Sequence, residues 1–255
     1  MRKPYIYCTI DTETVGGASR PTGMYNLGAV IHDKDGNIFA TLSLLVMEHY
    51  DEIAMDDYAK QNFHLYEQYL ESGVVTPVQT EAEALLMLRM LCREYGVKYL
   101  ICYNTGFDLC KTCCRELLDE FEFIDAYLMA LETITHKKSY AKFCRENGYR
   151  SRSGKSCATS AESVYAYING NGEYVEEHTA LADALIECEI FAACYRMHKR
   201  FTKNCHQWDC KDFSRKCFPK WEAPAPKPRM VRCPANYDGE IPPQRPHRGR
   251  PFVYA

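Results

Sequence analysis

The sequence has 255 residues, of which 46% are hydrophobic and 25% charged, enough for one substantial globular core. No apolar run approaches the roughly 18 residues of a membrane helix, and the N-terminal residues do not form a secretory signal, so we expect a cytoplasmic protein. The net charge of −3 conceals an acidic body, residues 1–200, and a basic tail, residues 201–255, with 11 Lys and Arg against 5 Asp and Glu. An acidic body keeps nucleic acid at a distance except where metals or local basic groups neutralise phosphate.

Hydrophobic periodicity predicts an α/β fold. Alternating, β-branched segments predict strands at 5–10, 25–32, 38–46, 98–103 and 121–126. Helical periodicity predicts helices at 80–95, 107–118, 139–147, 159–168 and 178–198, and an aromatic-rich, helical insertion at 51–72. Three antiparallel strands followed by alternating strands and helices predict a mixed sheet. The tail holds nine of the twelve prolines, which predicts an extended or disordered segment.

Fourteen cysteines leave two interpretations open. Without a secretory signal, reduced thiols are favoured over disulfides. Structural zinc is the alternative, with ligands from Cys110, Cys113 and Cys114 or from the four cysteines of the tail. Neither set has the paired spacing of a zinc ribbon.

A first acidic motif lies at the end of the first predicted strand. Asp11 and Glu13 are two residues apart, so their carboxylates project to the same face. Two like charges there are costly unless a divalent cation lies between them. The pattern alone is weak, because Asp238 and Glu240 repeat it in the tail.

Two further motifs each have a functional and an ordinary interpretation. Asn104, Phe107 and Asp108 follow a central strand, where open α/β sheets place their ligand crevices, although an acidic residue also suits any first helical turn. His178 and Asp183 open the last predicted helix and can both reach a site beside its N-terminus. The alternative for His178 is a residue that starts a helix and has no catalytic task.

In order and spacing, the three motifs together resemble those of the DnaQ-like 3′–5′ exonucleases, the His-containing DEDDh branch that includes RNase T and oligoribonuclease. The resemblance spans residues 4–198, and its 138–183 segment looks most like exonucleases encoded by bacteriophages. It implies a ribonuclease H-like fold, with a mixed five-stranded sheet flanked by helices. The exonuclease domain would occupy residues 1–200, followed by the basic, Pro-rich extension at 201–255.

The resemblance also implies a metal-dependent active site. Asp11, Glu13 and Asp183 would bind a first cation, Asp11 would bridge to a second, and Asp108 would support the second directly or through water. His178 would be the general base that takes a proton from the attacking water. Four carboxylates independently suit Mg²⁺ or Mn²⁺, because these ions prefer oxygen ligands. Two such ions can stabilise the attacking and leaving oxygens of an in-line displacement at phosphorus.

The implied substrate is the 3′ end of single-stranded DNA or RNA, and the implied product is a nucleoside 5′-monophosphate. Main-chain groups near Thr12 and Thr14, with Glu13, would hold the terminal 3′-hydroxyl. Asn104 and Phe107 are further candidate substrate residues. The sequence does not distinguish DNA from RNA, since the 2′-hydroxyl is sensed by side chains that the motifs do not identify.

Two segments, residues 51–72 and the basic loop within 148–158, are not shared by minimal members of the superfamily, and we expect them to influence substrate choice. In the loop, Arg150, Arg152 and Lys155 are candidate phosphate contacts, although a solvated loop is the commoner explanation. Relatives often form homodimers, and the oligomeric state is left open. Two other functions are considered: a catalytically inactive nucleic-acid-binding or scaffold protein with the same fold, and a phosphohydrolase of small nucleotides.

Overall fold

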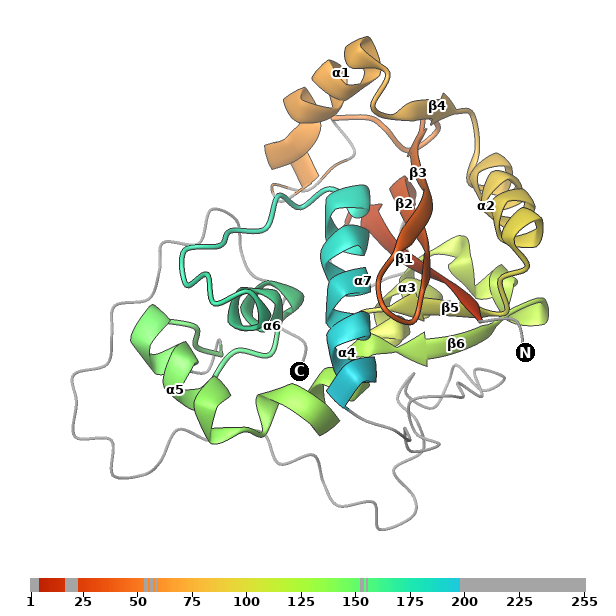
Figure 1. Cartoon of the computed structure of the whole chain (residues 1–255). Coiled ribbons are helices and arrows are strands. Elements are labelled where there is room, and N and C mark those ends of the chain that lie inside the picture. Colours follow the sequence, from red (N-terminus) through yellow and green to blue (C-terminus); the bar gives the residue numbers. More distant parts are fainter. Residues whose placement is uncertain are drawn as a thin grey trace.

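The computed structural model describes residues 5–16, 23–52, 55, 57, 59–151, 154 and 156–197 (Figure 1). The predictions for the 201–255 extension and for Arg152 and Lys155 lie outside these residues. Within them, no helix combines the length and the apolar character that crossing a membrane requires.

One mixed sheet of six strands forms the centre of the fold. The strands are β1 (Ile6–Thr14), β2 (Met24–Asp33), β3 (Ile38–Val46), β4 (Thr76–Val78), β5 (Tyr99–Cys102) and β6 (Glu122–Asp125). Their order is β4-β3-β2-β1-β5-β6, with β2 antiparallel to both its neighbours and the other pairs parallel. The predicted α/β fold with a mixed sheet is confirmed. The sixth strand, β4, was not predicted, because three residues are too few to show alternation.

Helices cover both faces of this sheet. In the described part of the chain they are α1 (Phe63–Ser72), α2 (Glu81–Tyr95), α3 (Thr105–Lys111), α4 (Ala126–Ala130), α5 (Lys138–Asn147), α6 (Ala161–Ile168) and α7 (Ala180–Met197). The prediction for 80–95 is confirmed in detail. The Thr80 hydroxyl accepts a hydrogen bond from the Glu83 N–H at 3.2 Å, and Gly96 ends α2 with a φ of 66°.

The helix predicted at 107–118 is corrected by the structure. It begins earlier, as α3, and ends at Lys111, after which Cys113–Asp119 form 3₁₀ turns. Thr112 lies between them in an extended conformation, where its hydroxyl donates to the Asp108 carbonyl oxygen at 2.6 Å and accepts from the Cys114 N–H at 3.1 Å. These local side-chain bonds compete with the helical ones and divide the segment. Helix α4, which was not predicted, is capped by the Asp125 carboxylate.

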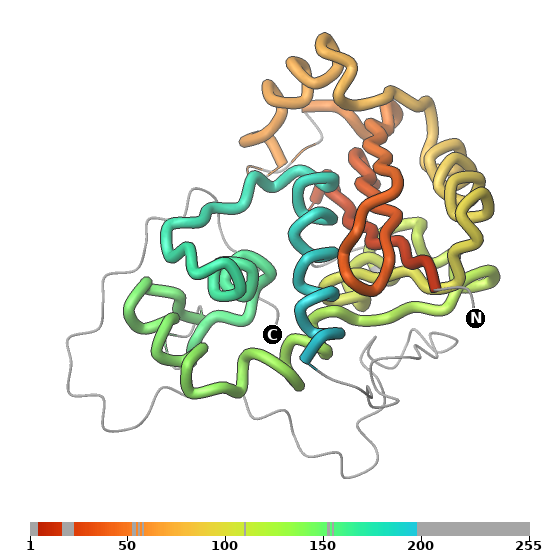
Figure 2. The backbone as a smooth tube through the Cα atoms, viewed as in Figure 1, coloured from red at the N-terminus to blue at the C-terminus, as the bar shows by residue number. Residues whose placement is uncertain are grey.

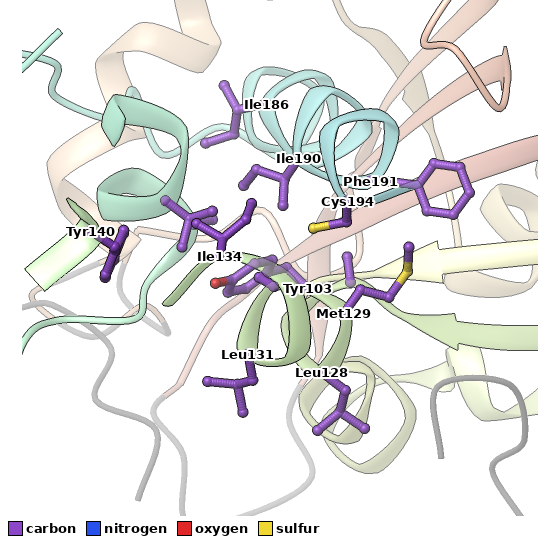
Figure 3. Close-up of a cluster of buried hydrophobic side chains, with 14 of the residues drawn as sticks. Tyr103, Leu128, Met129, Leu131, Ile134, Tyr140, Ile186, Ile190, Phe191 and Cys194 are labelled. Carbon is purple, nitrogen blue, oxygen red and sulfur yellow. The ribbon is translucent and has the colours of Figure 1, made fainter. Parts of the chain in front are cut away.

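Helix α7 lies between the sheet and a lobe formed by α4, α5 and α6 (Figures 1 and 2). Its residues Ile186, Ile190 and Cys194 join one buried cluster with Tyr103 and Met129 (Figure 3). Because α7 is covered on both sides, apolar residues occur around most of its circumference. On the other face of the sheet, α2 packs against a second cluster. The N-terminal end of α7 is thereby fixed against β1 and β2, which is where the candidate site lies.

Candidate active site

Asp11, Glu13 and Asp183 form a compact carboxylate group. Asp11 and Glu13 lie on β1, and Asp183 lies in the first turn of α7. One oxygen from each residue falls within 4.8 Å of the others, although 170 positions separate Glu13 from Asp183 in the sequence. The strand was predicted to end at Asp11, whereas β1 continues to Thr14, so Glu13 is also held by sheet hydrogen bonds opposite Asn26.

Asn26 and Gly28 of β2 bring the start of α7 to these carboxylates. The Asn26 side-chain oxygen accepts a hydrogen bond from the Ala180 N–H at 2.9 Å, which satisfies one of the free donors of the helix N-terminus. Gly28 pairs with Asp11 in the sheet, and its lack of a side chain leaves room for the backbone of Ala180. Since Asp183 follows Ala180 by one helical turn, these contacts set its distance from β1.

His178 lies beside the carboxylate group, ahead of α7. Its Nδ1 atom is 4.0 Å from Asp183 Oδ2 and 3.5 Å from Glu176 Oε2, and its side chain is 27% exposed. The predicted helix start at His178 is wrong by two residues, because His178 has a φ of 60° and α7 begins at Ala180. The imidazole is therefore close to Asp183 and still reachable from solvent.

Asp108 is near the group but is held separately. It is buried on α3, and its Oδ1 atom accepts a hydrogen bond from the Thr12 hydroxyl at 2.8 Å. Its charge raises the pKa of both Asp11 and Glu13, which indicates proximity, but its oxygens are outside the 4.8 Å group. The structure thus gives the Thr12 side chain a specific partner that the sequence did not predict.

Burial and mutual repulsion make the carboxylates difficult to ionise. Burial, followed by the charges of Glu176 and Asp108, raises the pKa of Glu13 to about 8. Burial also raises the pKa of Asp108 to about 7, against the lowering effect of the Thr12 hydrogen bond. The pKa of Asp11 and that of Asp183 are both well above the usual range, again mainly through burial and then through neighbouring carboxylates. A cluster of this kind needs positive charge to be stable as anions.

Two further acids of the cluster were missed in the sequence. Glu187 is 4% exposed on α7, one turn after Asp183, and accepts a hydrogen bond from the Tyr103 N–H at 3.1 Å. Its charge is the first of the neighbouring charges that raise the pKa of Asp11. Burial raises the pKa of Glu176, beside His178, to about 8. The four-residue spacing of Asp183 and Glu187 is a helical-face signal that could have identified Glu187.

The group fits a divalent cation. Asp183 Oδ1 is buried and has no hydrogen-bond partner among the described residues. An unpaired buried carboxylate oxygen is costly, and a cation would satisfy it while neutralising Asp11 and Glu13. All three residues offer oxygen, the donor that hard divalent cations prefer. A separate acidic set, Glu48, His49 and Glu81, has similar spacing, but its carboxylates already accept the backbone N–H groups of Met24 and Glu81.

The described cysteines are free thiols, and none belongs to a candidate metal group within the described residues. The other candidate substrate residues have local roles of their own. The Thr14 hydroxyl donates to the Gly16 carbonyl oxygen, and Asn104 precedes α3 with a φ of 71°. Phe107 is half-buried on α3. Arg150 donates to the Gly154 carbonyl oxygen at 2.8 Å, which stabilises the basic loop from within.

Comparison with solved structures finds a similar fold in 3′-exonucleases. The chain is similar to a 3′-exonuclease structure described as recognising the 3′ end of the histone mRNA stem-loop, with a TM-score of 0.52, 13% identity, and 76% of this chain and 82% of that chain covered. It is also similar to the structure of a full-length 3′-exonuclease, with a TM-score of 0.52, 14% identity, and 76% of this chain and 82% of that chain covered. A third similar structure is the nuclease domain of 3′hExo, a DEDDh family member bound to rAMP. Its TM-score is 0.51 at 13% identity, and 76% of this chain and 94% of that chain are covered. No family model and no curated protein sequence matches the chain. At these identities the likeness is one of fold: the chain shares the α/β architecture of these 3′-exonuclease structures, with a mixed sheet flanked by helices.

Proposed function

We propose that this protein is a metal-dependent 3′–5′ exonuclease that releases nucleoside 5′-monophosphates from the 3′ ends of single-stranded DNA or RNA. The observation that carries the proposal is the meeting of Asp11, Glu13 and Asp183 within 4.8 Å, with the His178 imidazole beside Asp183. The likeness of fold to 3′-exonucleases supports the same reaction class.

The four carboxylates and His178 have different roles in this proposal. Asp11, Glu13 and Asp183 would hold a first cation, and Asp108 with Asp11 would hold a second; Mg²⁺ or Mn²⁺ suits this all-oxygen donor set. When bound, the two cations neutralise charge on the attacking and leaving oxygens at phosphorus. His178 takes the proton from the attacking water, whose oxygen forms the new bond to phosphorus. The bond from phosphorus to the 3′-oxygen of the preceding nucleotide breaks, and that oxygen leaves on the shortened strand and takes up a proton from solvent.

Other chain groups orient the strand. Main-chain groups at Thr12 and Thr14 bind the terminal 3′-hydroxyl, which restricts the reaction to ends, and Asn104 and Phe107 flank the last nucleotide. The Thr12 hydroxyl orients Asp108, which would hold the second cation, through its 2.8 Å hydrogen bond. In this proposal the exonuclease domain is residues 1–200.

The test is a 5′-labelled oligonucleotide incubated with Mg²⁺ or Mn²⁺, in matched DNA and RNA forms, single- and double-stranded. Stepwise shortening by the wild type and none by Asp11→Asn is expected, with a loss of about 100-fold to 10,000-fold for His178→Ala. Asp35→Asn is the matched control, because Asp35 is an exposed acid paired with Lys34. It should shorten the strand at the wild-type rate.

Two other outcomes would reject the proposal. Binding of the strand without shortening would identify a catalytically inactive nucleic-acid-binding or scaffold protein. A strand that stays full length while small nucleotides are hydrolysed would identify a phosphohydrolase.

A further inference from the structure

The segment that carries His178 has an unusual backbone. Among the described residues other than glycine, only Asn104 and His178 have a positive φ, and that of His178 is 60°. A histidine in the left-handed region is strained and persists only where its surroundings hold it. The surroundings of His178 therefore explain how its imidazole comes to lie beside Asp183.

Helix α1 supplies much of this surrounding, from a segment more than 100 positions earlier in the sequence. Figure 1 shows α1 near the N-terminal end of α7. Asn62, which precedes α1, donates through its side-chain amide to the carbonyl oxygens of both His178 and Glu177. Tyr69 donates its hydroxyl to the Glu177 carboxylate at 2.7 Å, and Thr179 donates to the same carboxylate oxygen at 3.0 Å.

A third contact connects α1 with the start of α7. Tyr66 is almost fully buried, and its hydroxyl donates to the Asn26 side-chain oxygen at 2.7 Å. The same oxygen accepts from the Ala180 N–H, and Asn26 lies opposite Glu13 in the sheet. Residues on both sides of His178 are thus hydrogen-bonded, directly or through Asn26, to one short helix.

These polar contacts are additional to the packing of α1. The helix is anchored by an apolar cluster in which Tyr66 packs with Tyr25, Leu45 and Val75. Asn62 and Tyr69 direct their polar groups away from that cluster, toward residues 177 and 178. Packing alone does not require these bonds, because both side chains are near solvent and could bond to water.

We propose that Asn62, Tyr66 and Tyr69 form a clamp that positions His178. This inference rests on the proposed function, in which His178 is the general base. Asn62 fixes the left-handed backbone of His178, and Tyr69 fixes the neighbouring Glu177. The three residues bond to Asn26, Glu177 and the backbone of His178 and act through them, so we class them as positioning residues. The 51–72 insertion lies outside the three motifs, and in this proposal its residues Asn62, Tyr66 and Tyr69 position the general base.

Single-turnover rates with excess enzyme test the clamp. Asn62→Ala should lower the rate constant at saturating enzyme about tenfold or more, with an unchanged half-saturating enzyme concentration, since a misplaced general base slows only the chemical step. Tyr69→Phe keeps its ring and should lower the rate severalfold. Tyr50→Phe is the matched control: its hydroxyl donates to the Phe63 carbonyl oxygen, and it should behave as wild type.

A double-mutant cycle separates positioning from general damage. In a His178→Ala background, Asn62→Ala should cause no further loss, because the clamp acts through the imidazole. The same fold-loss in both backgrounds, or a raised half-saturating enzyme concentration with an unchanged rate constant, would overturn the clamp. If Asn62→Ala fails to fold, the Tyr69→Phe cycle decides in the same way. A wild type that does not shorten any strand would instead reject the proposed function.

Discussion

Gly28 of β2 lies so close to Ala180 of α7 that a Cβ atom at position 28 would overlap the Ala180 carbonyl carbon and oxygen. Gly28 is also the sheet partner of Asp11, and Ala180 precedes Asp183 by three residues. This backbone contact, together with the Asn26–Ala180 hydrogen bond, therefore sets how closely the carboxylates of β1 and α7 approach each other. Glycine is required here for close approach, whatever its φ.

Gly28→Ala should push the start of α7 away from β1. The cost of overpacking is expected to be at least about 1–3 kcal/mol of unfolding free energy, and nuclease activity should fall more than this destabilisation explains. Gly73→Ala is the control: its φ is 71° and no atom lies within 4 Å of the added Cβ, so strain alone costs about 1 kcal/mol. The measurements are thermal unfolding and nuclease rates of both variants. An equal loss of activity in the two would show that close approach at Gly28 has no special effect on the site.

The raised carboxylate pKa values predict how pH and metal together control stability. Glu13, with a pKa of about 8, and Asp108, with one of about 7, bind protons in the folded protein that an unfolded chain releases near pH 4. The contribution of these protons to the free energy of unfolding is therefore complete below about pH 4, and it is lost as the pH rises toward 7–8. A divalent cation replaces these protons, so its stabilising effect should grow with pH.

The measurement is the shift in Tm between EDTA and Mn²⁺ at pH 5.5 and pH 8. We expect the larger shift at pH 8, where each kcal/mol corresponds to about 2–4 °C for a protein of this size. A triple variant, Asp11→Asn with Glu13→Gln and Asp183→Asn, should show almost no shift at either pH. Equal shifts at both pH values in the wild type would show that protons and cation do not compete.

Thr12→Val tests the support of Asp108. Removing the 2.8 Å hydrogen bond takes away an interaction that lowers the Asp108 pKa, so the carboxylate should bind a cation about 10-fold to 100-fold more weakly. The half-saturating Mg²⁺ concentration should rise, and more at pH 6.5 than at pH 8.5. Thr9→Val is the control, because it also breaks a buried bond on β1, to His32. An unchanged Mg²⁺ requirement in Thr12→Val would separate Asp108 from metal binding.

Parts of this site were predictable because their spacing in sequence maps onto fixed geometry. Asp11 and Glu13 share a face of one strand, and Asp183 lies in the first turn of a strongly apolar helix. The fold and the meeting of these three carboxylates agree with that prediction, while their catalytic roles remain predictions. Helix 80–95 was equally predictable, since a capping threonine and a terminal glycine act locally.

The remaining features depend on interactions that no local pattern encodes. Asn62 and His178 are joined across 116 positions, and the left-handed φ of His178 follows from its neighbours rather than from its own preference. Glu176 becomes part of the cluster only because the loop before α7 folds back toward Asp183. Thr112 interrupts α3 through its own side-chain bonds, against the helical periodicity around it.

The basic loop offers a final prediction, on how the strand is bound. Arg150 is engaged with the Gly154 carbonyl oxygen, so Arg152→Gln with Lys155→Gln removes charge without disturbing that bond. If the two side chains bind phosphates, KM should rise at unchanged kcat. The dependence of log(kcat/KM) on log salt should also become shallower, by about 0.7 for each phosphate of a single strand that is no longer neutralised. The effect on KM should vanish at high salt, where exposed charges are screened. An unchanged slope would mean that Arg152 and Lys155 do not neutralise phosphates of the bound strand.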